Sequence, residues 1–568
     1  MRFHVLATDY DGTLAHHGTV SDTTIVALER LKASGRKLVL VTGREVPDLE
    51  KVFPQVALCD SVVAENGAVI YQPSTREVRP LTEAPPPAFV ATLRARGVKD
   101  VSVGHVIVAT WQPYEQVVLD TIREMGLELQ VIFNKGAVMI LPSGVNKAFG
   151  LKAALEELKL SPHNTVAIGD AENDHAFFAV SECAVAVQNA LPALKDRADW
   201  VTAGDHGHGV EELCGALLDS DLAAVAGRIE RNNLALGTAD DGTEVRLPVY
   251  APPVLLAGTS GAGKSTLVTA LMEQLTEHGY QYCIIDPEGD HSELPNLTSL
   301  GDASNPPSAT ALMELLSLPG RNVAVNLLAV PLAERAAFFE SLLPHLLDLR
   351  TRYGRPHWLI FDEAHHLAPA DRQGLSLPRE LFGVALVTVH PEHVNPALLE
   401  GVAAAVVIGK EPGETLARFA GVIGSKAPRV EQTALPPGEA LMWYRGTPGA
   451  PVHFRARPPR AEHRRHVRKY AAGELGPDRS FYFRGPEGKL NLRVQNLQLF
   501  LQLADGVDDA TWEHHLRRGD YSGWFREAIK DPELADEAAA AEGDRDLGPA
   551  ESRARIRAAV EKRYTAAA

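Results

Sequence analysis

The 568-residue sequence has little of several features that would place it in a specialised class. It has four cysteines, Cys59, Cys183, Cys214 and Cys283, and no CxxC pair, so neither a disulfide framework nor a cysteine zinc site is expected. No apolar run approaches the ~18 residues of a membrane span, and the first residues, MRFHVLATDYDG, do not fit a signal peptide. A net charge of −17 excludes a generally basic nucleic-acid coat, so nucleic-acid contact would need a local basic patch. We therefore expect a cytoplasmic protein without membrane contact.

The composition is otherwise that of ordinary globular proteins, with 45 % apolar and 23 % charged residues. At ~150 residues per domain, this length predicts three or four domains. Apolar strand-like runs alternate with helical stretches twice along the chain, which predicts two parallel sheets and a multidomain α/β fold. Near the end, Trp512, Trp524 and Phe525 at helical spacing predict a hydrophobic core rather than a ligand site. The expected parts are an α/β core over residues 1–81 and 146–225, a small α/β cap over 82–145, a P-loop domain over 226–455, a basic linker over 456–485 and a helical domain over 486–568.

The first sheet predicts a cluster of catalytic side chains at the ends of its strands. Asp9 and Asp11 follow the strand FHVLAT, and carboxylates two residues apart can divide nucleophilic and acid–base work. Thr42 ends the next strand and offers a hydroxyl to a phosphoryl oxygen, while Lys147 opens the helix after the cap and can neutralise the transferring group. Residues 169–174, GDAEND, supply hard oxygen ligands for magnesium.

Taken in this order, these elements resemble the motifs of the haloacid dehalogenase (HAD) superfamily. ENGA at 65–68 and the GDAEND form are similar to its Cof-type branch, and the small cap resembles that of archaeal-type phosphoglycolate phosphatases. The resemblance implies a Rossmannoid core in which Asp9 attacks phosphorus, and Asp11 protonates the leaving oxygen and then activates water. It also implies a magnesium site of Asp9, the Asp11 backbone carbonyl and Asp170, supported by Asn173 and Asp174.

A second set of motifs predicts an ATP site. Residues 258–265, GTSGAGKS, form a complete GxxxxGK[ST] between an apolar strand and a helix, and their backbone N–H groups can hold phosphates. Lys264 would reach the β- and γ-phosphates, and Ser265 would bind magnesium. Asp362 and Glu363 end the strand HWLIF, so Asp362 would position magnesium and Glu363 would polarise water. The expected ATP-binding residues are Gly258, Thr259, Ser260, Gly261, Ala262, Gly263, Lys264, Ser265, Thr266 and Asp362.

The surroundings of these motifs resemble one branch of P-loop enzymes. DPEGD at 286–290 and the order of the strands are similar to the HerA/FtsK branch of ring-forming, RecA-like ATPases, although His390 stands where that branch usually has glutamine. The resemblance implies a homo-oligomer, with a hexamer favoured, and DNA as a candidate partner. A basic stretch over residues 455–469 is a candidate contact for phosphate backbones, with a solvated linker as the alternative. Ring ATPases also use an arginine from a neighbouring chain, for which the candidates are Arg350, Arg352, Arg355 and Arg429.

The favoured interpretation is a magnesium-dependent phosphomonoester hydrolase fused to an ATP-hydrolysing domain. Its expected cofactors are Mg²⁺ and ATP, and its expected substrate is a phosphorylated small molecule or a nucleic-acid end. A bifunctional kinase–phosphatase of the end-healing type is one alternative, although Glu363 favours hydrolysis over transfer to an acceptor. A nucleotide-gated scaffold with a vestigial phosphatase is the other.

Overall fold

The computed structural model describes residues 1–568 except 292–293, 295, 373–377, 379–380, 448, 461–469, 472, 474, 530 and 565–568. Its contacts divide the chain into two compact units, Met1–Asn232 with Arg350–Arg355, and Asn233–Leu349 with Pro356–Ala568. Much of the basic stretch, including Arg464 and Arg465, lies outside the described residues. None of the helices in the described part is both long and apolar enough to cross a membrane. All four cysteines are buried and free.

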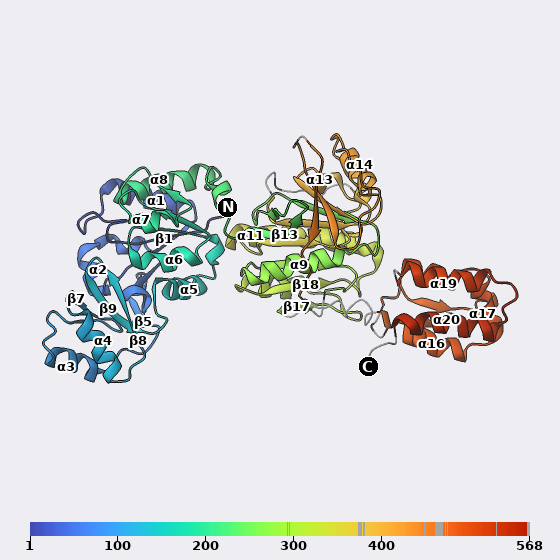
Figure 1. Ribbon diagram of the computed structural model, residues 1–568, viewed down its shortest axis with the longest axis horizontal. Helices are drawn as coiled ribbons and strands as arrows, with labels where there is room; N and C mark the ends of the chain where they lie inside the picture. The colour runs from blue at the N-terminus through green and yellow to red at the C-terminus, as the bar shows by residue number, and fades with distance from the viewer. Residues whose placement is uncertain are drawn as a thin grey trace. The chain divides into compact units, whose positions relative to one another are not determined.

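The first unit is built on a largely parallel sheet with the strand order β12-β11-β10-β1-β2-β3-β4-β5. Pairing is parallel from β12 to β3 and antiparallel at β4 and β5. Because central parallel strands are buried on both faces, helices must cover both, and in Figure 1 α1 and α8 lie on one side and α5 and α6 on the other. The strands are β1 (Val5–Thr8), β2 (Lys37–Val41), β3 (Ser61–Ala64), β4 (Val69–Gln72), β5 (Glu77–Pro80), β10 (Thr165–Gly169), β11 (Cys183–Ala186) and β12 (Trp200–Val201), and the helices are α1 (Asp22–Ala33), α2 (Val46–Val52), α5 (Lys147–Glu157), α6 (His175–Val180), α7 (Pro192–Lys195) and α8 (His206–Ser220).

A small cap interrupts this sheet between β5 and α5. It has an antiparallel sheet of order β6-β7-β9-β8 and its own core, which includes Phe89, Leu93 and Val118. A two-residue turn joins β8 to β9, and Lys135 and Gly136 at that turn both have positive φ, as a tight hairpin of this kind requires. The hairpin therefore presents Lys135 at its tip. The cap elements are α3 (Pro87–Ala95), β6 (Ser102–Val103), β7 (Val108–Trp111), α4 (Glu115–Glu124), β8 (Leu129–Asn134) and β9 (Ala137–Pro142).

The second unit contains a longer sheet with the order β14-β13-β23-β22-β21-β15-β20-β19-β16-β18-β17. Strands β21 to β17 of this order are parallel, whereas β22, β23, β13 and β14 extend the sheet in antiparallel fashion. The P-loop follows β15 and the acidic pair follows β19, with β20 between them. The strands are β13 (Leu234–Ala239), β14 (Glu244–Leu247), β15 (Val254–Gly258), β16 (Tyr282–Asp286), β17 (Leu297–Leu300), β18 (Asn322–Asn326), β19 (Trp358–Phe361), β20 (Val384–Thr388), β21 (Ala404–Ile408), β22 (Glu439–Tyr444) and β23 (Val452–Ala456), and the helices are α9 (Lys264–Glu277), α10 (Ala309–Ser317), α11 (Leu332–Tyr353), α12 (Ala364–Leu367), α13 (Pro396–Leu399) and α14 (Pro412–Val422).

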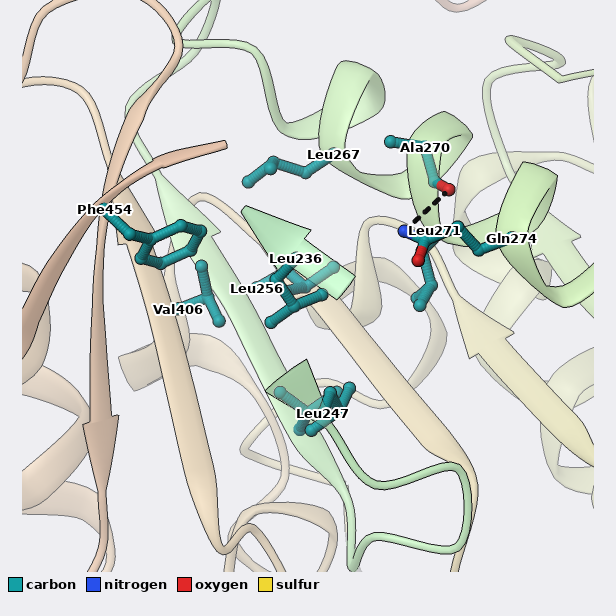
Figure 2. A pocket seen from close by; sticks show the side chains of 10 residues that line it. Leu236, Leu247, Leu256, Leu267, Ala270, Leu271, Gln274, Val406 and Phe454 are labelled. Atoms are coloured by element: carbon teal, nitrogen blue, oxygen red, sulfur yellow. Dashed lines mark hydrogen bonds between the residues drawn. The ribbon is translucent and has the colours of Figure 1, made fainter. Parts of the chain in front are cut away.

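Helix α9 leaves a small apolar cavity above this sheet. Figure 2 shows Leu267 and Leu271 of the helix above leucine side chains of the strands. The cavity has a volume of about 20 Å³, so it could hold no more than a water molecule and is a packing gap rather than a ligand site. At its edge, Gln274 fastens the β13–β14 hairpin to α9, because its Nε2 donates to Ala235 O at 2.8 Å and its Oε1 accepts from Ala235 N at 2.7 Å.

The C-terminal region packs around aromatic side chains. Trp512 and Phe525 are fully buried and Trp524 nearly so, which confirms that these residues form a core. Tyr470, Leu475 and the β24–β25 hairpin join the same core, so part of the chain expected to be a linker is folded here. The multidomain α/β class predicted from the sequence is confirmed. The elements are β24 (Phe481–Phe483), β25 (Leu492–Val494), α16 (Leu497–Gly506), α17 (Asp509–Leu516), α18 (Asp520–Glu527), α19 (Pro532–Gly543) and α20 (Pro549–Tyr564).

Candidate active sites

The loop after β1 carries two carboxylates that face different surroundings. Asp9 is buried, whereas the side chain of Asp11 is 40 % exposed. Tyr10 between them points into the core, where its hydroxyl donates to Gly18 O and Val52 O. Gly12 has φ +90°, and a Cβ there would lie 2.4 Å from Asp170 Oδ2, so only glycine lets this turn approach the β10 loop. The loop thus separates a buried carboxylate, Asp9, from an accessible one, Asp11.

Lys147 connects Asp9 to the loop after β10. Its Nζ lies 2.5 Å from Asp9 Oδ1 and 2.6 Å from Asp174 Oδ1, and all three side chains are buried. Asn146 caps the helix that carries Lys147 by accepting a hydrogen bond from Phe149 N at 3.1 Å. Burial raises the pKa of Asp9 to about 8 even though Lys147 opposes the rise. Burial alone would lower the pKa of Lys147, but Asp174 and Asp9 together hold it above its ordinary value, so Lys147 is a permanent cation.

The carboxylates around Asp9 fit a divalent cation. Oxygen atoms of Asp9, Asp170 and Asp174 lie within 4.8 Å of one another. The Lys135 ammonium from the cap stands in for such a cation, because Nζ donates to Asp11 O at 2.9 Å and to Asp170 Oδ2 at 2.8 Å. Asp174 Oδ2 accepts the backbone N–H groups of Asp170 and Ala171 at 2.8 and 2.9 Å, while its Oδ1 faces Lys147. Asp174 therefore holds the loop in place, and Asp9, the Asp11 carbonyl and Asp170 are the atoms best placed to hold magnesium.

Arg44, which the motif reasoning did not single out, fixes the side chain of Asp11. Its Nε and Nη2 donate to the two carboxylate oxygens, each at 2.7 Å, in the bidentate geometry that arginine favours. Thr42 is fully buried at the end of β2, and its Oγ1 accepts from Arg44 N at 3.1 Å. Because Arg44 follows Thr42 by two residues at the end of an apolar strand, the sequence could have indicated that it lies near the same site.

Glu65 anchors the cap to the core. Its buried carboxylate accepts the backbone N–H groups of His105, Val106 and Ile107 at 2.8, 2.8 and 2.9 Å. Glu65 has φ +50°, a conformation that costs a non-glycine residue free energy and therefore needs compensation from the surrounding structure. The ENGA stretch marked a family branch in the sequence, but nothing in it indicated which loop the glutamate would hold.

The P-loop joins β15 to α9. Gly261 and Gly263 have φ of +76° and +101°, and a Cβ at Gly258 would lie 2.4 Å from Ile408 O, so these glycines meet backbone requirements. Lys264 Nζ donates to Gly258 O at 3.1 Å and Thr259 O at 3.2 Å. Lys264, Ser265 and Thr266 lie in the first turn of α9, where backbone N–H groups can bind phosphate.

The acidic pair follows β19 at the same edge of the sheet. Asp362 and Glu363 are both nearly buried, and Asp362 Oδ1 accepts from Glu363 N at 3.0 Å. His291 Nε2 lies 3.5 Å from Asp362 Oδ2, and His365 Nδ1 lies 3.6 Å from Glu363 Oε2. His365 Nδ1 also hydrogen-bonds Thr388 Oγ1 at 3.0 Å, which links the acidic pair to the end of β20.

The arginines proposed to reach the nucleotide of a neighbouring chain differ in their exposure to solvent. Arg355 is fully buried and donates to Lys159 O within the first unit, so its guanidinium cannot reach a neighbouring chain, and the expectation for this residue is wrong. Arg429 is exposed. An arginine that the sequence reasoning placed in a linker, Arg479, instead pairs with Glu288 beyond β16.

Comparison with known proteins identifies both regions. The model of haloacid dehalogenase-like hydrolases matches residues 6–99 and 131–213, and that of the AAA ATPase domain matches residues 244–382. A phosphoglycolate phosphatase of Methanothermobacter thermautotrophicus is 32 % identical over 213 residues, covering 36 % of this chain and 95 % of the relative. One of Haloarcula marismortui is 33 % identical over 224 residues, covering 36 % and 94 %. A haloacid dehalogenase-like hydrolase from Bacteroides thetaiotaomicron aligns at 19 % identity and a TM-score of 0.34, covering 38 % of this chain and 99 % of that one.

Proposed function

Through its amino-terminal region the chain belongs to the haloacid dehalogenase-like hydrolases, and on that premise we propose that this phosphatase cleaves small phosphorylated carboxylates with Asp9 as nucleophile. The same chain carries an AAA ATPase domain, so it is an enzyme with two hydrolase activities. The observation that carries the proposal is the buried group of Asp9, Lys147 and Asp174, closed from the cap side by Lys135.

The proposed reaction has two steps. An Asp9 oxygen attacks phosphorus while the substrate's alkoxide leaves and takes a proton from Asp11, giving an aspartyl-phosphate. Water then loses a proton to Asp11 and attacks phosphorus, which releases phosphate and restores the Asp9 carboxylate. Lys147 neutralises charge on the phosphoryl oxygens, and Arg44 orients Asp11. Magnesium, held by Asp9, the Asp11 carbonyl and Asp170, would supply further charge neutralisation when bound.

Two cations near Asp11 support a carboxylate on the substrate. Lys135 reaches the site from the cap tip, and Arg44 lies beside the exposed carboxylate of Asp11. With magnesium held by Asp9, the Asp11 carbonyl and Asp170, the Lys135 ammonium would be available to pair with an anionic group next to the phosphoester. The relatives named phosphoglycolate phosphatases are consistent with this class of substrate.

Steady-state kinetics on two substrates test the proposal. Lys135→Met should lower kcat/KM for 2-phosphoglycolate about tenfold or more, since a charge-assisted hydrogen bond contributes ~1.5–3 kcal/mol. The same variant should change hydrolysis of p-nitrophenyl phosphate, which lacks a carboxylate, much less. Lys99→Met, an exposed lysine of the cap, is the matched control. An equal loss on both substrates would contradict carboxylate recognition by Lys135.

For the ATPase we propose a HerA-like enzyme that works as a ring, with a hexamer favoured and DNA as a candidate partner. The antiparallel extension of the sheet beyond β21 and the exposed Arg429 support this finer assignment. Head-to-tail contacts that close into a ring would let an arginine from one chain reach the nucleotide of the next. ATPase rate per chain should then rise with protein concentration and fall for Arg429→Ala. A monomer by light scattering with a concentration-independent rate would refute the ring.

Nucleic-acid contact is a separate proposal that depends on the basic stretch. If about four to six of its cations bind phosphates, duplex affinity should fall with salt with a log–log slope near −4 to −5. Replacing Arg464, Arg465, Arg468 and Lys469 with alanine should flatten that slope. Undetectable binding of duplex DNA at low salt would contradict this proposal and favour the alternative that the stretch is a solvated linker.

A further inference from the structure

The segment that leads into the C-terminal region, with Asp478 and Arg479, contacts the ATPase domain near the acidic pair that follows β19. Arg479 Nη1 lies 3.1 Å from Glu288 Oε1, and the two side chains are only 12 % and 10 % exposed. Glu288 follows β16, which pairs in parallel with β19, so Glu288 and the acidic pair lie beyond the same edge of the sheet. Asp478 adds a second contact, since its Oδ2 lies 3.5 Å from Nη2 of the buried Arg335 in α11.

The core of the C-terminal region fixes Arg479 from the other side. Arg479 Nη2 donates to the Tyr470 hydroxyl at 3.2 Å and to Ala528 O at 2.7 Å. The indole Nε1 of Trp524 donates to Arg479 O at 2.9 Å. Tyr470 is fully buried and Trp524 nearly so, which restrains both the backbone and the guanidinium of Arg479. The C-terminal region therefore holds the Arg479 side chain in a fixed position against Glu288 of the ATPase domain.

Three buried carboxylates follow β16 and β19 on this side of the ATPase domain, and they require a nearby positive charge. Glu288, Asp362 and Glu363 are each more than nine-tenths buried, and buried carboxylates are costly without a nearby cation. Burial alone would lower the pKa of Arg479, but Glu288 foremost, with Glu363 contributing, holds it above the ordinary value. Arg335 lies nearby and pairs with Asp478. Arg479 is thus a cation in direct contact with Glu288, and the nearby charge of Arg335 adds to its effect.

We propose that Arg479 is a positioning residue for ATP hydrolysis, supplied in cis by the C-terminal region, which holds Glu288 beside the acidic pair Asp362 and Glu363. This role presupposes the ATPase activity and adds a means by which docking of the C-terminal region enables it. Without the guanidinium, the negative charge of Glu288 would repel Asp362 and Glu363, the carboxylates expected to hold magnesium and polarise water. Hydrolysis should suffer more than binding, because the P-loop residues that hold the phosphates follow a different strand.

Steady-state ATP hydrolysis by the full chain tests this role. Arg479→Ala should lower kcat about tenfold or more and change KM for ATP by less than about threefold. Glu288→Gln removes the charge that needs neutralising, so adding it to Arg479→Ala should bring kcat to within about threefold of Glu288→Gln alone. Arg484→Ala, an exposed arginine of the same segment, is the matched control and should keep the wild-type rate.

A wild-type rate in Arg479→Ala, or additive losses in the double variant, would overturn the proposal. If Arg479→Ala does not fold, as judged by melting, Arg479→Lys is compared with Arg479→Gln. The lysine variant should retain more activity because it keeps the cation, and equal losses would overturn the proposal. A wild type no more active than Lys264→Ala would instead overturn the ATPase assignment.

Discussion

Substitution of Glu65 should uncouple the cap from the catalytic core. Its carboxylate accepts three backbone N–H groups, and those of Val106 and Ile107 are buried. A buried donor left without a partner costs ~1–3 kcal/mol, so Glu65→Ala should destabilise the anchored loop by about 2–6 kcal/mol. Alanine gives no relief at φ +50°, because it has the same Cβ as glutamate. Glu65→Gln keeps one acceptor oxygen and should lose roughly half as much.

Hydrogen exchange is the suitable assay, since a chain of several domains has no single free energy of unfolding. In Glu65→Ala the amides of residues 105–107 should exchange about 30-fold faster or more, the rate factor that corresponds to ~2 kcal/mol. Phosphatase kcat/KM should fall about tenfold to a hundredfold, because small displacements at the reacting centre are costly, while the ATPase rate stays unchanged. Glu45→Gln, which affects one hydrogen bond from Ser102 to the core, is the control. Unchanged exchange at residues 105–107 in Glu65→Ala would refute the anchoring role.

Four further expectations concern the two sites. Lys264→Ala should abolish ATP hydrolysis and leave phosphatase activity intact, and loss of both in a folded variant would argue against independent sites. Lys147→Met should lower phosphatase kcat about 10²–10³-fold, the usual effect of removing one preorganised electrostatic contact, and a loss under about threefold would contradict its role. Burial raises the pKa of Asp9 to about 8, and a carboxyl must lose its proton to coordinate, so Mg²⁺ affinity by calorimetry should increase up to about tenfold per pH unit between pH 6 and 8. For the same reason, metal-free protein should lose stability across that interval, since the folded state binds the proton more tightly than the unfolded state, and a flat profile would contradict the pKa.

Local spacing was enough to predict which side chains gather at the ends of the strands, where we propose that they act on phosphate. Asp9 and Lys264 stand in short patterns whose backbone geometry follows from strand, turn and glycine, so their surroundings can be worked out from neighbouring residues. Lys135 reaches Asp170 only because the cap hairpin closes over the core, and no local pattern encodes that contact. Arg479 lies in a segment whose composition is typical of a linker. Its contacts with Glu288, Trp524 and Ala528 join parts of the chain that are far apart in sequence, so the local pattern could not predict them.

The same limit explains the error at Arg355. A helix-end arginine is usually exposed, and the sequence carries no sign that residues 350–355 pack with the first unit. Burial of its guanidinium against Lys159 O is a tertiary contact over a separation of 196 residues. The burial of Arg355 thus depends on long-range packing, which the residue pattern of a single segment cannot predict.

Trapping the phosphorylated enzyme tests the central claim most directly. The full chain is mixed with Mg²⁺ and 2-phosphoglycolate that carries the radiolabel in its phosphate, quenched in acid within one turnover, and divided into two portions. We expect label bound to the denatured protein in the untreated portion. In the portion reduced with borohydride we expect homoserine in place of Asp9, because borohydride reduces an aspartyl-phosphate to homoserine and releases the phosphate. Asp9→Asn should give neither signal. Turnover of the substrate without labelled protein, or homoserine at another aspartate, would contradict Asp9 as the nucleophile.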